Sequence, residues 1–158
     1  MITFYSKTPK KASFSSILAI FSLLFAIFII PGCSKSGASE QDQMISFAKS
    51  KSINYTTDPS GILYEIITPG STTHPTINST VTVTYTGLLM NGSQFDAGTI
   101  TYALNQLIPG WGIAVQKIGV GGQIKVLIPS SLAYGSSGAG SIPGNAPLYF
   151  DIKLTAVK

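Results

Sequence analysis

The sequence predicts an α+β fold in which four to six antiparallel strands curl around a single short helix. Three observations point to this fold. From residue 54 onward the chain consists of short β-like runs separated by Gly, Pro, Asn and Ser. These runs alternate apolar and polar residues, as antiparallel strands do when one face packs on a core and the other meets water. One segment of this region has convincing helical spacing, and one helix can cover one face of one sheet.

Four runs are predicted to be strands from their alternation and from the turn residues that bound them. They cover residues 61–67, 81–86, 123–128 and 148–156. In the second run Val81, Val83 and Tyr85 share one face and threonines share the other, so Tyr85 is expected to point towards the core. In the last run, every second residue from Leu148 to Ala156 falls on one apolar face.

The helix is predicted directly after the dipeptide Pro109-Gly110. Four apolar residues at positions i, i+3, i+4 and i+7 form one stripe, namely Trp111, Ala114, Val115 and Ile118. Gly119 and Gly121 follow and end the segment. We expect this stripe to face the sheet.

Residues 1–32 have the order of a secretory signal, because three lysines precede an apolar run over residues 14–30. The residues that end at Cys33 resemble the lipobox of bacterial lipoproteins, which predicts cleavage before Cys33 and acylation of that residue. The expected location is therefore the cell envelope, with a lipid anchor in the membrane. Ser34 favours the outer membrane by analogy, with the domain facing the periplasm or the cell surface. An uncleaved membrane anchor and a buried cysteine are the alternatives.

Residues 33–53 are predicted to link this anchor to the domain. The segment begins with a Ser/Gly-rich stretch that is typical of a flexible tether. Met44, Phe47 and Ala48 then follow at helical spacing, which fits either a short helix packed on the domain or a continuation of the tether. We place the domain boundary between Lys51 and Tyr55, so that the domain covers residues 54–158.

Composition excludes several classes of function. The chain of 158 residues has one cysteine and one histidine, Cys33 and His74, too few for a zinc site, a disulfide or a Ser-His-Asp triad. No metal and no cofactor are therefore expected. Without residues 1–32, seven lysines face six acidic residues, and the chain contains no arginine. Nucleic-acid binding is accordingly not expected, and a monomer is the expected state.

Five motifs, in order over nearly 100 residues, resemble the FKBP-type peptidyl-prolyl cis-trans isomerases. They are Val83-Thr84-Tyr85-Thr86-Gly87, then Phe95-Asp96 after Gly92, then Leu107-Ile108-Pro109-Gly110-Trp111, then Leu132-Ala133-Tyr134-Gly135 after Ile128-Pro129, and finally Leu148-Tyr149-Phe150-Asp151-Ile152 after Ile142-Pro143. The resemblance implies a half-barrel sheet wrapped on the helix, with an apolar pocket between them for the proline of a substrate chain. Proline-containing exported or unfolded polypeptides are the implied partners, together with macrolide inhibitors.

The resemblance also implies which residues form the site. The catalytic residues would be Tyr85, Asp96, Tyr134 and Phe150, and the substrate-binding residues would be Phe95, Leu107, Ile108, Trp111 and Ile142. In this assignment Ile108 donates its backbone N–H and Tyr134 its hydroxyl to carbonyl groups of the substrate. Asp96 would orient and stabilise by its charge rather than transfer a proton.

Each assignment has a structural alternative. The aromatic residues could be ordinary core side chains, Asp96 could cap a turn, and Tyr134 could anchor a loop. The sequence also departs from the family pattern, because only five residues separate Asp96 from Tyr102. Many members have several more there, including an arginine that pairs with the aspartate. We therefore expect turnover and macrolide affinity below the family norm.

Three functions are compatible with these observations. The first is an envelope lipoprotein that isomerises X-Pro bonds and so assists the folding of exported proteins, whose slow steps are often prolyl isomerisations. The second is a module that binds proline-containing or apolar segments without useful catalysis. The third is an unrelated β-rich envelope lipoprotein with an adhesive or assembly role.

Overall fold

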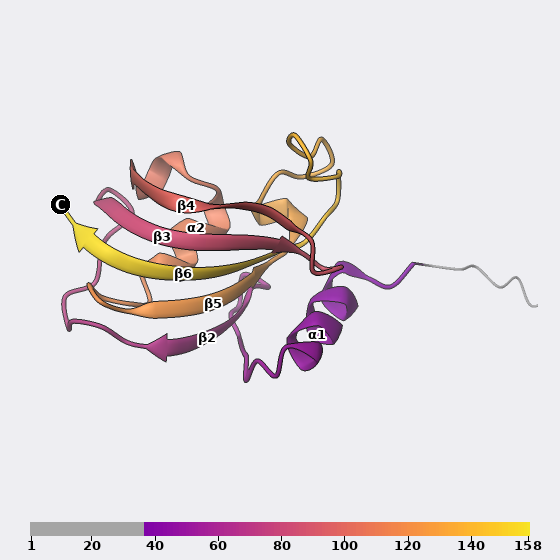
Figure 1. Ribbon diagram of the computed structural model, residues 1–158, viewed down its shortest axis with the longest axis horizontal. Coiled ribbons are helices and arrows are strands. Elements are labelled where there is room, and N and C mark those ends of the chain that lie inside the picture. Colours follow the sequence, from indigo (N-terminus) through magenta and orange to yellow (C-terminus); the bar gives the residue numbers. More distant parts are fainter. Residues whose placement is uncertain (1–36) are drawn as a thin grey trace, which may run out of the picture. The chain divides into compact units, whose positions relative to one another are not determined.

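A computed structural model of the protein describes residues 37–158, and it confirms the predicted α+β fold. Its strands are β1 (Thr56–Thr57), β2 (Leu63–Thr68), β3 (Thr80–Leu89), β4 (Gln94–Ala103), β5 (Gln123–Ile128) and β6 (Leu148–Val157). They form one antiparallel sheet in the order β1-β2-β5-β6-β3-β4. The helices are α1 (Glu40–Ser50) and α2 (Pro109–Val115), with short 3-10 turns η1 (Leu104–Gln106) and η2 (Ser130–Leu132) (Figure 1).

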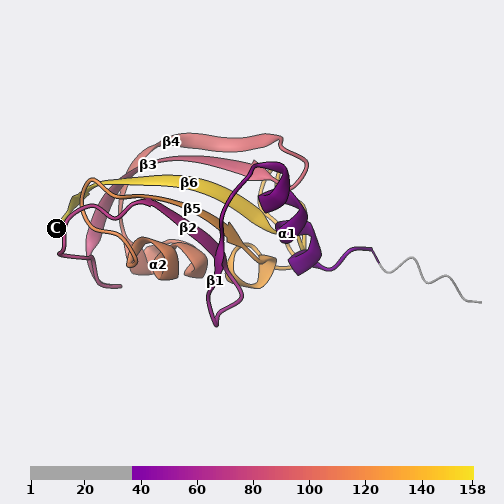
Figure 2. The same cartoon turned by 90° about the horizontal axis from the view of Figure 1, so that it is seen from below.

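The sheet is curved, and α2 lies against its concave face (Figure 2). The apolar stripe of the helix is buried there, as the spacing predicts, against inward-facing residues of the central strands. The members of this core include Val83, Ile124, Val126, Ile152 and Leu154 from the sheet, and Trp111, Ala114 and Val115 from α2. The core therefore occupies the concave side, and the predicted inward faces of residues 81–86 and 123–128 are confirmed.

One predicted face changes at the end of the sheet. A bulge in the β3–β6 pairing lies between Thr82 and Val83, so Val81 pairs with Val157 while Thr82 pairs with Ala156. β6 therefore has one extra residue between Leu154 and Ala156. This residue reverses the alternation of β6 beyond the bulge, because side chains of successive residues point to opposite faces. Val157 therefore packs against the core in place of Ala156.

Two strands were missing from the prediction. β1 has only two residues, and β4 runs for ten residues as the edge of the sheet, paired with β3 alone. The sequence of β4 is polar and contains Gly98, so its alternation is weak. Its pairing fixes it as a strand: Thr82 and Thr84 of β3 meet Thr101 and Thr99 of β4, with hydroxyl oxygens 2.9 Å apart in both pairs.

The convex face of the sheet is covered by α1 at one end. Leu63, Leu127, Tyr149 and Leu88 occupy one row across β2, β5, β6 and β3, on the face opposite to Val126 and Phe150. Met44, Phe47 and Ala48 of α1 are buried against this row. The helical alternative for this segment is therefore correct, and the expectation of a solvated second face is wrong at this end.

The predictions for the N-terminal part of the chain are not tested by the structure. The proposed signal over residues 1–32 and the lipidation site at Cys33 lie outside the described residues. The domain boundary between Lys51 and Tyr55 stays a prediction, although α1 packs with the sheet in one compact unit. Within residues 37–158, no helix is long and apolar enough to span a bilayer.

Gly110 allows α2 to approach the sheet closely. A Cβ atom at this position would lie 2.4 Å from Cγ2 of Ile128, which is fully buried in β5. A buried isoleucine in a packed core has little room to move. The glycine thus sets how deeply the start of the helix, and with it Trp111, lies in the concave face.

An ion pair attaches the turn after β1 to the segment that follows α2. The Lys117 Nζ atom lies 2.7 Å from an Asp58 carboxylate oxygen, and 4.6 Å from the ring centroid of Tyr64. Ser60 donates two further hydrogen bonds to the same carboxylate. Hydrogen bonding from Lys117, followed by that from Ser60, lowers the pKa of Asp58 to about 2.

We predict that Gly110→Ala destabilises the fold by about 1–3 kcal/mol, because the added methyl group overpacks the contact with Ile128. The helix propensity of alanine acts in the opposite direction by about 1 kcal/mol. Urea denaturation measures the difference. Gly98→Ala is the matched control, since no atom lies within 4 Å of its added Cβ. Equal stability of the Gly110 variant and the wild type would contradict the prediction.

We also predict that Lys117→Met lowers the free energy of unfolding by about 1 kcal/mol at pH 7. The folded pKa of Asp58 is lowered from 3.8, so the stabilisation is present above pH 4 and is lost as the pH falls towards 2. The gap between wild type and variant should therefore shrink between pH 4 and pH 2, as measured by urea denaturation across that range. Lys153→Met, at an exposed position on β6, serves as the control and should show no such gap.

Candidate active site

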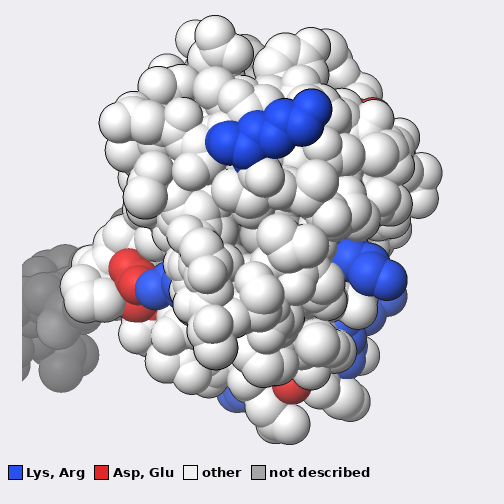
Figure 3. Space-filling model, turned by 90° about the vertical axis from the view of Figure 1, so that its left-hand side faces the viewer, with Lys and Arg blue, Asp and Glu red and all other residues white. Residues whose placement is uncertain are grey.

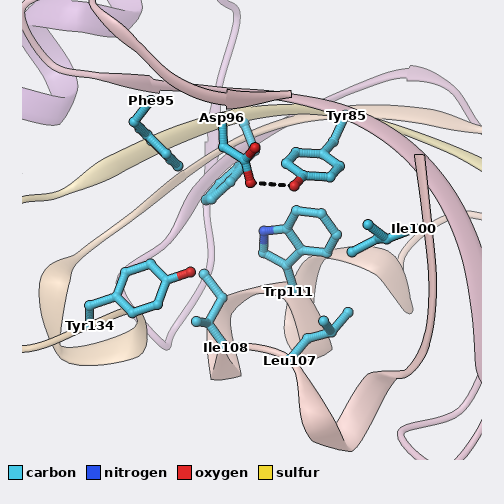
Figure 4. A pocket seen from close by; sticks show the side chains of 9 residues that line it. Tyr85, Phe95, Asp96, Ile100, Leu107, Ile108, Trp111 and Tyr134 are labelled. Atoms are coloured by element: carbon cyan, nitrogen blue, oxygen red, sulfur yellow. Dashed lines mark hydrogen bonds between the residues drawn. The ribbon is translucent and has the colours of Figure 1, made fainter. Parts of the chain in front are cut away.

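A pocket opens between the concave face of the sheet and the start of α2. Its wall consists of Tyr85, Phe95, Asp96, Ile100, Leu107, Ile108, Trp111, Tyr134 and Phe150 (Figure 4). These residues come from β3, β4, β6, the N-terminal end of α2 and the segment after η2. Its cavity volume is about 90 Å³, so the pocket is small compared with typical ligand pockets.

Four aromatic rings build the apolar part of the pocket. Trp111 lies at the centre, with ring centroids 5.0 Å from Tyr85 and 5.2 Å from Phe150, both nearly perpendicular to it. Phe95 meets Phe150 edge to face at 5.5 Å. Edge-to-face contacts of this kind favour one fixed arrangement of the rings. Trp111 is 3% exposed and forms the floor of a rigid aromatic pocket.

Gly87 makes room for two of these rings. A Cβ atom at this position of β3 would lie 2.6 Å from Cζ of Phe95 and 3.0 Å from Cε1 of Phe150. Gly87 pairs with Phe150 on β6 and with Asp96 on β4, so it lies between the aromatic and the acidic parts of the wall. A side chain here would occupy the space that the rings fill.

Tyr85 and Asp96 form the polar part of the wall. The Tyr85 hydroxyl donates a hydrogen bond to one carboxylate oxygen of Asp96, and the backbone N–H of Ala97 donates to the other at 2.9 Å. Burial, and then the hydrogen bond with Asp96, raises the pKa of Tyr85 to about 12. Both oxygens of the carboxylate are thus oriented, and the tyrosine keeps its proton at neutral pH.

Hydrogen-bond donors surround the opening. Tyr134 is 41% exposed, and its hydroxyl points into the pocket (Figure 4). Ile108 is the N-cap of α2, where the backbone N–H takes no part in the helical hydrogen-bond pattern. The Nε1 atom of Trp111 is buried and has no hydrogen-bond partner within residues 37–158. An unsatisfied buried donor is costly, so a bound acceptor at this atom would be favourable.

Eight of the nine residues assigned to the site from the sequence lie together in this wall. Ile142 is not among the residues that line the pocket, and its side chain, 8% exposed, belongs to the core cluster that also contains Trp111 and Phe150. Ile100 was missed. It faces inward from β4 opposite Val83, and only recognition of β4 as a strand would have revealed it. The functional roles of all these residues stay predictions.

The short segment after Asp96 leaves one side of the pocket with a small wall. Residues 97–103 continue β4 without a loop, and Tyr102 is 52% exposed and does not reach the pocket. The described residues contain one ion pair, Lys117 with Asp58, so Asp96 has no cationic partner among them. The wall on this side consists of Phe95, Asp96 and Ile100 alone.

Comparison with known proteins agrees with this geometry. The family model described as FKBP-type peptidyl-prolyl cis-trans isomerase matches residues 71–155. The chain is 40% identical over 123 residues to FKBP-type peptidyl-prolyl cis-trans isomerase FkpA of Aeromonas hydrophila, which covers 75% of this chain and 45% of that protein. It is 43% identical over 106 residues to outer membrane protein MIP of Legionella longbeachae, covering 63% of this chain and 46% of that protein.

The fold agrees as well. The crystal structure of FkpA from Escherichia coli matches with a TM-score of 0.69 at 35% identity, over 75% of this chain and 57% of that one. The chain spans about half the length of the curated relatives that it matches. The family match extends over more than half of the sequence, and the chain therefore belongs to the family of FKBP-type peptidyl-prolyl cis-trans isomerases.

Proposed function

We propose that this protein catalyses the cis-trans isomerisation of X-Pro peptide bonds. The observation that carries the proposal is a pocket with an aromatic floor and walls, beside which a carboxylate is fixed by a neutral tyrosine. Family membership supports the same activity. The reaction makes and breaks no covalent bond, so a site without a nucleophile or a metal suffices for it.

An apolar pocket lowers the barrier through the electronic structure of the amide. Rotation about a prolyl bond costs about 18–20 kcal/mol because the C–N bond has partial double-bond character. The planar amide carries more charge on its carbonyl oxygen than the twisted amide does, so water stabilises the planar form more. The rings of Tyr85, Trp111 and Phe150 exclude water from the proline and thereby favour the twisted form.

The donors at the opening would hold the substrate while it twists. In this proposal the backbone N–H of Ile108 and the hydroxyl of Tyr134 bind carbonyl groups next to the proline. Fixing the chain on either side of the rotating bond keeps the reacting geometry populated. Both groups lie on the same pocket as the aromatic floor.

Asp96 would act by its charge and its orientation. The Tyr85 hydroxyl and the Ala97 N–H fix its carboxylate beside the space for the amide. Asp96 is itself exposed, so its contribution is expected from the fixed orientation of its carboxylate. Proton transfer by Tyr85 is disfavoured because its pKa is raised to about 12.

We further propose a lipid-anchored protein of the cell envelope that assists the folding of exported proteins. Proline-containing polypeptides would be its partners, and macrolide inhibitors would bind in the same pocket with low affinity because β4 adds no further wall. The name of the Legionella relative, an outer membrane protein, supports an envelope location. Most of the face drawn in Figure 3 is uncharged, with a few lysines and fewer acidic side chains.

A second function is supported by one observation. Asp96 has no cationic partner within the described residues, and the wall beyond it is short. A pocket reduced in this way could bind proline-containing segments without useful turnover. The experiment on catalysis separates the two functions.

We predict that the purified protein accelerates exchange of an X-Pro peptide above buffer, and that Asp96→Ala, Tyr134→Phe and Phe150→Ala each lower kcat/KM by about tenfold or more. Exchange NMR measures the rate without a coupling protease. Each variant loses a group that supplies a fixed charge, holds the substrate or excludes water, respectively. Tyr102→Phe is the matched control, because Tyr102 is exposed and lies outside the pocket.

Melting curves recorded alongside separate a damaged site from a damaged fold. Binding of the peptide, detected by the fluorescence of Trp111, with no catalysis by the wild type would favour the second function. An absence of both binding and catalysis would reject the pocket as a site for proline.

We predict that Cys33→Ser abolishes lipid attachment. The intact protein should partition into the detergent phase and carry acyl chains at its N-terminal cysteine, as measured by mass spectrometry of the mature protein. Two or more chains give a lasting anchor, whereas one is marginal. A mature protein without acyl groups would contradict the prediction, and Ser34→Ala serves as the neighbouring control.

A further inference from the structure

Helix α1 reaches the segment that carries Tyr134 through one side chain. Glu40 is the first residue of α1, and its two carboxylate oxygens accept hydrogen bonds from the backbone N–H and from the hydroxyl of Ser130, both at 2.6 Å. Ser130 is 5% exposed, and it is the only buried polar residue of residues 37–158. Ninety positions in the sequence separate these partners, so the contact is purely tertiary.

Ser130 in turn fixes the backbone on both sides of the tyrosine. Its carbonyl accepts hydrogen bonds from the N–H groups of Ala133 and Gly135, both at 2.9 Å. The Gly135 carbonyl then accepts from the N–H of Asn145 at 2.8 Å. Tyr134 lies between the two N–H groups that Ser130 holds, so a shift of Ser130 would move Tyr134.

The helix is a firm support for this contact. Met44, Phe47 and Ala48 are buried on the convex face, where Phe47 meets Tyr149 with ring centroids 5.2 Å apart. Ser39 caps the helix start by accepting a hydrogen bond from the Asp42 N–H. Glu40 therefore begins a capped helix that is packed on β5 and β6, the strands on either side of the segment with Tyr134.

We propose that Glu40 is a positioning residue of the active site, which acts through Ser130 to hold the Tyr134 hydroxyl over the pocket. This inference rests on the proposed isomerase function and adds to it the helix that precedes the domain. Hydrogen bonds to a carboxylate are about twice as strong as neutral ones. Removal of Glu40 leaves the N–H and the hydroxyl of a buried serine without their partner, which favours a rearrangement of the turn.

The test is a double-mutant cycle on the full chain in detergent. We expect Glu40→Ala to lower kcat/KM for an X-Pro peptide by about fivefold, because a displacement of a fraction of an ångström reduces catalysis. In the background of Tyr134→Phe the same change should cost less than about twofold, since the hydroxyl that it positions is already absent. Glu40→Gln keeps two neutral hydrogen bonds and should recover part of the activity.

Asp42→Ala is the matched control. Asp42 lies in the same turn of α1, but its carboxylate accepts a hydrogen bond from the Ser39 hydroxyl rather than from Ser130. We expect this variant to keep wild-type activity in both backgrounds. If Glu40→Ala lowers kcat/KM by the same factor in the wild type and in the Tyr134→Phe background, Glu40 supports only the fold. That result would overturn the inference.

Hydrogen exchange provides a readout that does not depend on catalysis. Glu40→Ala should speed exchange of the Ala133 and Gly135 amides at least about tenfold, while the amides of β5 and β6 stay protected. Unchanged exchange at these two amides would overturn the inference even in an active enzyme. The two proposals can also fail separately. If the wild type does not catalyse X-Pro exchange but Glu40→Ala still speeds exchange of the two amides, the isomerase function is rejected and the link between Glu40 and the turn remains.

Discussion

The packing of Trp111 in the concave face of the sheet is the interaction on which the rest of the structure depends. Its ring belongs to the core and to the pocket at once, with Tyr85 and Phe150 against it edge to face. Two glycines make this packing possible. Gly110 lets α2 approach β5, and Gly87 leaves room for the rings of Phe95 and Phe150. Folding energy and site geometry are therefore supplied by the same contacts, and a change in the depth of α2 alters both.

The two sides of the pocket are held by different means. The sheet side is fixed by strand pairing, so Tyr85, Asp96 and Phe150 keep their places through neighbouring backbone hydrogen bonds. The opposite side follows the 3-10 turn η2. There Tyr134 is positioned by Ser130, which in turn is hydrogen-bonded to Glu40 of α1. Strand pairing thus positions the rings on one side of the pocket, and a hydrogen-bonded turn positions Tyr134 on the other.

Local patterns in the sequence predicted much of this structure. The stripe that begins at Trp111 and the alternation around Val83 are set by neighbouring residues, and both elements formed as expected. β4 was missed because its pairing with β3, rather than its own residues, makes it a strand, and Ile100 was missed with it. Eight of the residues that the motif order assigned to the site line one pocket, whereas Ile142 lies in the neighbouring core cluster and does not line it.

The open edge of the sheet has a consequence for association between molecules. β4 presents ten residues whose outer backbone groups have no neighbouring strand in the described chain, and such an edge can recruit a strand from another copy. Asp96 points inward from this edge, so a second strand laid across it would have to accommodate a carboxylate already committed to Tyr85. Inward-pointing charges are one of the features by which edge strands disfavour pairing with another chain, and Asp96 occupies such a position on β4.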